Sequence, residues 1–125
     1  IGEMILKRVQ WKWLYILSVS LLTGVFTNPL GAKVSLVASV TDIQYIAEQI
    51  GGDRVNVYGM IRGFDDPHFV MTRPDFLVNL NTADVLCVIG LDLEVGWIPY
   101  LQQQARNIKI QKGQPGYCDT SVGVK

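Results

Sequence analysis

The sequence predicts an α/β fold class: a doubly wound lobe on a mostly parallel sheet of four strands. From residue 34 onward, short apolar segments alternate with segments whose apolar residues recur at helical spacing. Residues 85–89 are five consecutive apolar residues, a pattern typical of a parallel strand that helices cover on both faces. The connections between the segments are short, which implies right-handed crossovers between parallel strands.

The first 32 residues have the layout of a secretory signal peptide. Lys7, Arg8 and Lys12 form a basic start, residues 13–26 carry no charge, and Ala32 is a small residue at the expected cleavage point. We therefore predict cleavage after Ala32, which divides the chain into a signal peptide, residues 1–32, and a single lobe, residues 33–125.

An uncleaved membrane anchor is the alternative for the same segment. Residues 14–26 are shorter than the roughly 20 apolar residues that span a bilayer, and Asn28 and Pro29 interrupt their extension. In that alternative the N-terminal segment holds the chain at the inner membrane. No cysteine lies near Ala32, so the sequence does not indicate a lipid anchor.

Composition and motifs exclude two classes of function. Residues 33–125 carry eight Lys and Arg against ten Asp and Glu, without a basic run, so nucleic acid is not an expected partner. The chain has one histidine and contains neither a Gly-x-Ser-x-Gly nor a His-Glu-x-x-His motif, nor a glycine loop for phosphate. We therefore predict that it is not an enzyme and has no catalytic residue.

Residues 34–38 form the first predicted strand, and a helix follows it. Ser39 and Asp42 have the spacing of a capping box at the start of this helix, and Gly51 and Gly52 end it. The apolar residues of the helix recur at positions i, i+3, i+4 and i+7, so we expect them to face the sheet: Ile43, Ile46, Ala47 and Ile50.

A second strand is predicted around Val55 and Val57, and a helix over 73–81 follows with Pro74 in its first turn. Residues 85–89 form the third strand. The next helix has Pro99 near its start and an apolar face made of Trp97, Ile98, Leu101 and Ala105. Ile108 and Ile110 predict a fourth short strand, before a glycine-rich segment at 112–116.

The loop at 63–75 contains the single histidine. Pro67 and the residue before it favour extended backbone, which places His68 at the end of an extended segment. Thr72 and Asp75 then have the spacing of a capping box. His68 is therefore expected on a strand-to-helix loop. In an open parallel sheet such loops gather at the carboxyl ends of the strands, where ligands bind.

The two cysteines have different surroundings in the sequence. Cys87 lies inside the apolar third strand, whereas Cys118 follows the glycine-rich segment. A disulfide between them is permitted outside the cytoplasm. We interpret Cys87 as a small buried apolar residue and Cys118 as an incidental thiol.

Several short motifs, taken together, resemble one known family. They are Asp-Pro-His at 66–68, Arg-Pro-Asp at 73–75, Leu-Asn-x-Ala-Asp-Val at 80–85 and Gly-Leu-x-Leu-Glu-x-x-Trp at 90–97. The strand at 34–39, the helix end at 46–52 and the segment 113–124 fit the same pattern. The combination is similar to the N-terminal lobe of the periplasmic metal-binding proteins that serve zinc and manganese ABC transporters.

The resemblance implies a two-lobed protein whose lobes are joined by a long helix and hold a metal ion between them with four side chains. His68 matches the first of these ligands. A second histidine is expected shortly after Val124, and the remaining ligands later still. We therefore expect the sequence to be a truncated N-terminal lobe, with the second lobe missing.

The resemblance also implies the cargo, the partner and the location. A neutral imidazole is a good ligand for Zn²⁺ and an acceptable one for Mn²⁺, so we expect zinc, with manganese or iron as alternatives, and no organic cofactor. One ligand does not make a site, and the chain by itself is expected to bind metal weakly. The expected partner is the membrane permease of an ABC importer, met in the periplasm.

Other polar residues near the motifs have two interpretations each. Asp65 and Asp66 fit a role in orienting the His68 ring, but aspartates before a proline also commonly stabilise turns. Glu94 fits a metal carboxylate or the electrostatics of a helix start. Trp97 is expected in the core, and Arg73 fits either an anion site or a paired surface charge.

Two other functions stay open. A membrane-anchored or surface adhesion module that shares this lobe would keep residues 13–26 and would be indifferent to a His68→Ala change. A non-functional remnant with one ligand is the other alternative, and it requires a true stop codon after Lys125.

Overall fold

The computed structural model describes residues 31–124. The chain from Ala32 onward forms one compact unit. The predicted signal peptide lies outside the described residues, apart from its last two, so the structure does not test it. Among residues 31–124, none of the helices is long and apolar enough to cross a membrane.

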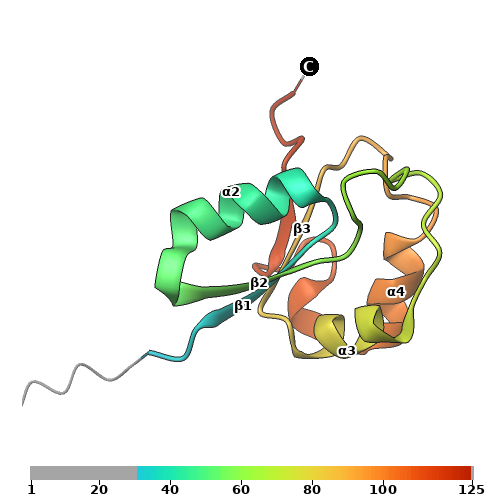
Figure 1. Ribbon diagram of the computed structural model, residues 1–125. Helices are drawn as coiled ribbons and strands as arrows, with labels where there is room; N and C mark the ends of the chain where they lie inside the picture. The colour runs from blue at the N-terminus through green and yellow to red at the C-terminus, as the bar shows by residue number, and fades with distance from the viewer. Residues whose placement is uncertain (1–30, 125) are drawn as a thin grey trace, which may run out of the picture. The chain divides into compact units, whose positions relative to one another are not determined.

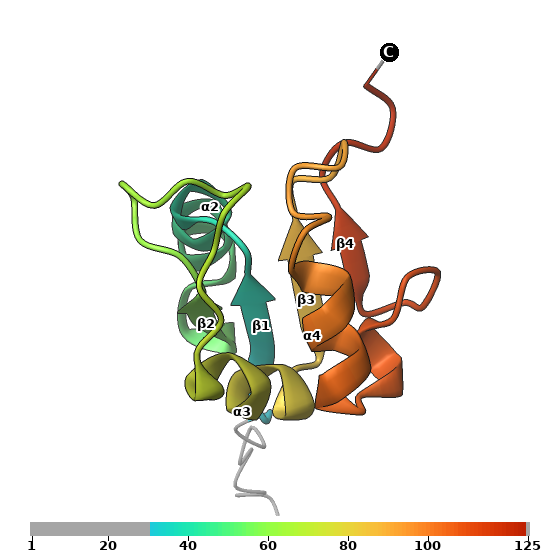
Figure 2. The same cartoon turned by 90° about the vertical axis from the view of Figure 1, so that its right-hand side faces the viewer.

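The centre of the fold is a parallel sheet of four strands in the order β2-β1-β3-β4, which confirms the predicted architecture (Figure 2). The strands are β1 (Val34–Ala38), β2 (Val55–Gly59), β3 (Val85–Val88) and β4 (Tyr117–Asp119). β1 lies in the interior of the sheet, because it pairs with β2 on one side and with β3 on the other.

Helices cover both faces of the sheet (Figure 1). α2 (Thr41–Gly51) packs on β1 and β2 from one side, and the short 3₁₀ helix η1 (Gly52–Arg54) follows it. α3 (Pro74–Thr82) and α4 (Ile98–Ala105) pack against each other on the other side. The chain leaves β1 towards one face and β3 towards the opposite face, so the topological switch point lies between these two strands.

The hydrophobic core lies mainly between the sheet and the pair α3 and α4. Its largest fully buried apolar side chains are Val37, Met60, Phe76, Leu80, Leu86, Leu101 and Ile110. Ile98, Leu101 and Ala105 of α4 are buried, as their helical spacing predicts. Phe76 and Leu80 of α3 are buried for the same reason.

The predicted strand at 108–110 is wrong. These residues form the 3₁₀ helix η2 (Ile108–Ile110), and the fourth strand lies further along the chain, at β4. The Asn107 side chain accepts a hydrogen bond from the backbone N–H of Lys109 and begins the turn. Ile110 is buried while Ile108 is exposed. The alternation of apolar and polar residues at 108–110 therefore fits a 3₁₀ turn as well as a short strand.

Neither predicted capping box forms. The N-cap residues are Val40 for α2 and Arg73 for α3, and neither helix start has a side-chain hydrogen bond from its cap. Ser39 is completely buried, and its hydroxyl is used elsewhere, as described below. Pro74 does occupy the first turn of α3, as predicted.

The inward face predicted for α2 is only partly correct. Ile43 is buried and Ala47 half-buried, but Ile46 and Ile50 are exposed. α2 contacts mainly β1 and β2, so its contact stripe is narrower than the apolar stripe of its sequence.

Candidate metal centre

The loops that follow the strands gather at one edge of the sheet, the carboxyl edge (Figure 2). Two of them carry the polar residues that the sequence singles out. The histidine loop, residues 60–73, follows β2 and leads into α3. The glutamate loop, residues 89–97, follows β3 and leads into α4. This is the edge at which open parallel sheets bind ligands.

His68 lies in the histidine loop with 59% of its side chain exposed. Its Nδ1 atom is 2.9 Å from Oδ1 of Asp66, and its backbone N–H donates to the same oxygen at 2.9 Å. Nε2 takes part in no hydrogen bond with the described residues. The ring is therefore held through one nitrogen and presents the other to the surroundings, the arrangement that a metal-binding histidine needs.

Asp66 and Asp65 are adjacent in the sequence but have different contacts. The backbone N–H of His68, and after it the His68 side chain, hold the pKa of Asp66 below its usual value. Asp66 is thus a charged acceptor for a proton on Nδ1, which favours the tautomer with a lone pair on Nε2. Asp65 instead accepts from the backbone N–H of Arg62 at 3.1 Å and makes no hydrogen bond to His68.

Trp97 anchors the histidine loop from the glutamate loop. Its Nε1–H donates to the backbone carbonyl of Pro67 at 2.8 Å, and the residue is 3% exposed. The indole ring lies beside Phe76, with 6.2 Å between ring centroids. The prediction of a core tryptophan is confirmed, but its positioning role was missed. A buried indole N–H needs an acceptor, and this requirement alone hints at such a contact.

Arg73 is a paired charge rather than a free anion site. Its guanidinium donates to both carboxylate oxygens of Asp75 at 3.2 Å, and it lies 4.7 Å from the centroid of the Phe76 ring. The hydroxyl of Tyr58 also donates to Asp75. The Tyr58 hydrogen bond, and after it the Arg73 contact, keep the pKa of Asp75 below its usual value. This network fixes the start of α3, where the histidine loop ends.

Glu94 is a buried and fully used carboxylate at the topological switch point. It is 4% exposed and accepts hydrogen bonds from the hydroxyl of Ser39 at 2.6 Å and from the backbone N–H groups of Ile89 and Gly90 at 2.7 and 3.2 Å. Glu94 does not lie at the start of α4, where the helix-start interpretation places it, because α4 begins only at Ile98. Glu94 joins the end of β1 to the end of β3, and each of its carboxylate oxygens accepts at least one hydrogen bond from this part of the fold.

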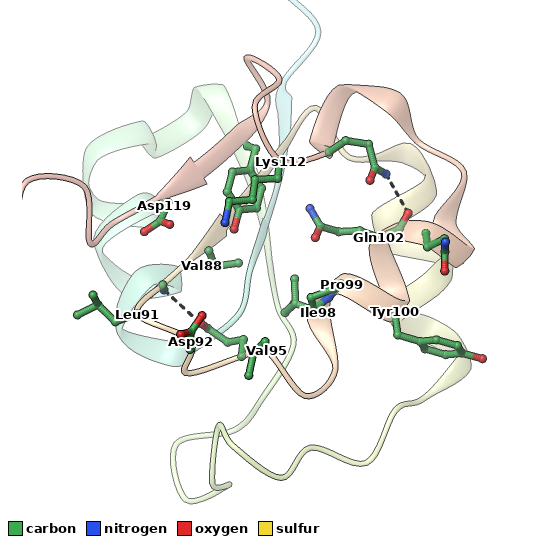
Figure 3. A pocket seen from close by; sticks show the side chains of 15 residues that line it. Val88, Leu91, Asp92, Val95, Ile98, Pro99, Tyr100, Gln102, Lys112 and Asp119 are labelled. Atoms are coloured by element: carbon green, nitrogen blue, oxygen red, sulfur yellow. Dashed lines mark hydrogen bonds between the residues drawn. The ribbon is translucent and has the colours of Figure 1, made fainter.

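A cavity of about 610 Å³ lies beside α4 and the ends of β3 and β4 (Figure 3). Val88 and Ile98 contribute apolar walls, and Asp119, Lys112 and Gln102 contribute polar groups. His68 does not line this cavity. In the part of the chain that the structure describes, no group of three His, Cys, Asp or Glu side chains lies close enough to hold a metal ion. His68 is therefore a single ligand candidate.

The family described as the periplasmic zinc-uptake complex component A, ZnuA, matches residues 36–122. The match covers the last three residues of β1, the strands β2 to β4 and both loops at the carboxyl edge.

Curated relatives are metal-transport proteins of streptococci. The chain is 28% identical over 93 residues to the "metal ABC transporter substrate-binding lipoprotein ScbA" of Streptococcus cristatus, which covers 74% of this chain and 30% of that protein. It is 26% identical over 98 residues to the "manganese ABC transporter substrate-binding lipoprotein scaA" of Streptococcus gordonii, covering 78% and 31%. The chain therefore spans about a third of the length of these relatives.

Solved structures share the fold. A crystal structure of ZnuA matches with a TM-score of 0.59 and 27% identity, over 74% of this chain and 34% of that chain. A zinc-bound ZnuA deletion mutant matches with a TM-score of 0.54 and 33% identity, over 58% and 28%. The manganese-bound periplasmic metal-binding protein of Candidatus Liberibacter asiaticus has a TM-score of 0.59 at 22% identity, over 74% and 32%, and supports the fold alone.

Proposed function

This chain belongs to the ZnuA family, the periplasmic component A of zinc-uptake complexes, and from that membership we propose that it is the N-terminal lobe of a solute-binding protein for a divalent metal ion. The proposed lobe comprises residues 33–125 and the proposed signal peptide residues 1–32. The family consists of solute-binding proteins for metal transport, not enzymes, so no residue is assigned a catalytic role.

The observation that carries the proposal is the state of the His68 ring. Nδ1 is held by Asp66 while Nε2 is left without a partner among residues 31–124, at the edge where parallel sheets bind ligands. A neutral imidazole oriented in this way is ready to donate its Nε2 lone pair to a metal ion. We assign His68 as the metal ligand and Asp66 as the residue that orients it.

Asp65, the second carboxylate before His68, supports the proposal less directly. It was predicted together with Asp66, but its oxygen is used by the backbone of Arg62. We propose that Asp65 stabilises the turn that precedes His68 and acts on the metal only through that turn.

The metal ion is the cargo of the proposed protein, and zinc is the proposed identity. Zinc is supported by the family description and by the zinc-bound relative, whereas several relatives are named for manganese. An imidazole serves both ions, so His68 alone does not discriminate between them. The ligands that complete the site are proposed to lie outside the described residues, because His68 stands alone there. No organic cofactor is needed for this function.

We further propose that the metal-loaded protein docks on the membrane permease of an ABC importer. The names of the relatives describe them as substrate-binding proteins of ABC transporters. Secretion through the N-terminal segment would place the protein in the periplasm. An uncleaved segment would place it on the outer surface of the inner membrane, where the same permease is accessible.

The test is a zinc titration of the whole protein as encoded in its genome, with His68→Ala as the main variant. Loss of a ligand is expected to lower zinc affinity by at least tenfold, because a structural or transport site needs about four donors. His68 is exposed, so the stability of the variant should stay within about 0.5 kcal/mol of the parent. Unchanged zinc affinity in His68→Ala would remove the proposed function.

Asp66 and Asp65 offer a matched pair of variants in the same titration. Asp66→Asn removes the charged acceptor of Nδ1 and is expected to weaken zinc binding roughly tenfold, at the lower end of the effect of such partners. Asp65→Asn makes the same chemical change one residue earlier, without a contact to His68; its amide oxygen can still accept from the Arg62 N–H and keep the turn, so affinity should be unchanged. Equal effects of the two variants would show that Asp66 does not act through the ring.

A further inference from the structure

The two cysteines lie directly opposite each other on neighbouring strands. In the register of β3 and β4, Cys87 pairs with Cys118, and both thiols are free. Neighbouring strands are roughly 4.7–4.9 Å apart, which falls inside the range of about 4.4–6.8 Å that Cα atoms of disulfide partners show. The sequence alone does not predict this pairing, because Cys118 lies next to a glycine-rich segment and outside all of the predicted strands.

Both thiols also point to the same face of the sheet. Val88 and its register partner Asp119 line the cavity beside α4, and so does Tyr117. Side chains alternate along a strand, so Cys87 and Cys118 point to the opposite face. Cys87 is 8% exposed and Cys118 is half-buried.

The Cys87 thiol interacts with its partner. Burial, and after it the neighbouring Cys118 thiol, raises the pKa of the Cys87 thiol to about 12. This neighbour lies at the register position directly opposite Cys87 on the adjacent strand. The raised pKa means that Cys87 is a poor nucleophile before it has a reacting partner.

We propose that Cys87 and Cys118 form a redox-active dithiol that closes to a cross-strand disulfide and ties β4 to β3. This site is independent of His68, and it does not depend on the proposed metal transport. The proposed secretion would bring it into a compartment where disulfides persist.

The reaction is a thiol–disulfide exchange with a small disulfide such as oxidised glutathione. The half-buried Cys118, as thiolate, attacks one sulfur of glutathione disulfide, forms a mixed disulfide and releases one glutathione thiolate. Cys87 then gives up its proton and attacks the Cys118 sulfur, and the second glutathione leaves as thiolate. Two protein thiols are oxidised, one glutathione disulfide is reduced to two thiols, and the protons pass to the released thiolates or to water.

The disulfide would fasten the most weakly held strand of the sheet. β4 has three residues and, in the part of the chain that the structure describes, lies at the edge of the sheet and pairs with β3 alone. The bond would close a loop of about 30 residues and is expected to raise the folding equilibrium constant on the order of a hundredfold. The gain should be largest in β4, whose backbone amides would exchange more slowly in the oxidised protein.

The experiment equilibrates the folded protein, as encoded in its genome, in glutathione buffers of increasing oxidised fraction, traps free thiols by alkylation and maps the peptides by mass spectrometry. The expected product is a monomer that has lost two hydrogen atoms and yields one linked peptide pair containing Cys87 and Cys118. Urea unfolding should then show a higher midpoint for the oxidised than for the reduced chain. Cys118→Ala removes only a half-buried thiol, and its midpoint should not respond to oxidised glutathione.

Three outcomes would overturn the proposal. In the first, both thiols are still alkylated after equilibration in the most oxidising buffer. In the second, Cys118 retains a glutathione or links two chains while Cys87 stays free. In the third, the linked peptide pair forms only in urea, which would mean that the folded sheet holds the sulfur atoms apart.

Discussion

The histidine loop and the glutamate loop leave the same edge of the sheet, yet their key side chains, His68 and Glu94, have opposite surroundings. The histidine loop exposes His68 and leaves its Nε2 atom without a partner in the described part of the chain. The glutamate loop buries Glu94 and surrounds it with three donors. A group that is oriented but incompletely bonded is available to a ligand, whereas a saturated buried carboxylate serves the fold.

The contrast also shows how the two loops depend on each other. Trp97, the last residue of the glutamate loop, donates to the carbonyl of Pro67, directly before His68. The histidine loop is long and has few buried side chains of its own. Its orientation is therefore set partly by Trp97, whose backbone N–H donates to the carbonyl of Glu94 at 3.2 Å. Three predictions test this division, in which the glutamate loop stabilises the fold and the histidine loop presents His68.

The largest effect is expected for Glu94→Ala. The change leaves the hydroxyl of Ser39 and the N–H groups of Ile89 and Gly90 without their acceptor in a buried place, which should lower the free energy of unfolding by about 3 kcal/mol. The change in the free energy of unfolding is measured by urea titration monitored by circular dichroism.

Glu48→Ala is the matched control, because Glu48 is exposed and, among residues 31–124, its carboxylate accepts a side-chain hydrogen bond from Gln44 alone. Its effect should stay within about 0.5 kcal/mol. A loss below about 1 kcal/mol in Glu94→Ala would mean that water or a rearranged side chain replaces the carboxylate, and the glutamate loop would not be the fastening element.

A smaller effect is expected for Trp97→Phe. The variant keeps an aromatic ring in the core but loses the hydrogen bond to Pro67, so the free energy of unfolding should fall by about 1–2 kcal/mol. Amide hydrogen exchange in residues 66–69 should accelerate more than in β3. Tyr100→Phe removes a polar group from an exposed aromatic on α4 and serves as control. Equal acceleration in both segments would contradict a specific tether.

The smallest effect is a local response to acid in the histidine loop. The pKa of Asp66 is lowered in the folded chain, first by the His68 N–H and then by the His68 side chain. On lowering the pH through the usual value of 3.8, the unfolded chain takes up the proton before the folded chain does, so this contribution to stability is present above 3.8 and is lost below it.

The amide resonance of His68 reports this titration in NMR spectra. Its shift should change with a midpoint below pH 3.8, and Asp66→Asn should abolish the change while keeping an oxygen acceptor for the turn. A midpoint above 3.8 would show that the carboxylate is not stabilised in its charged form.

The parts of the fold that were predictable have strong local patterns. β1 and β3 are apolar segments, and α4 and the burial of α3 follow helical spacing with a proline near each start. β4 was missed because Tyr117 to Asp119 offers only three residues, of which the last is charged. Its position depends on pairing with β3 and is therefore a tertiary effect.

The same distinction applies to the candidate site. The proline before His68 and the family motif locate the loop, and the neighbouring Asp66 is a local contact that sequence can anticipate. The bond between Ser39 and Glu94 joins residues far apart in the sequence and replaces the capping box expected at Ser39. Nothing in the local sequence distinguishes a serine that caps a helix from one that holds a distant carboxylate.

The interior position of β1 has a consequence for the growing chain on the ribosome. β1, α2 and β2 can associate as soon as residue 59 has emerged, because Val34 pairs with Val55. The other edge of β1 has to wait for β3, whose Val85 pairs with Leu36. For about 25 residues of synthesis the nascent chain therefore displays an unpaired apolar strand edge, the feature that invites aggregation and recruits chaperones.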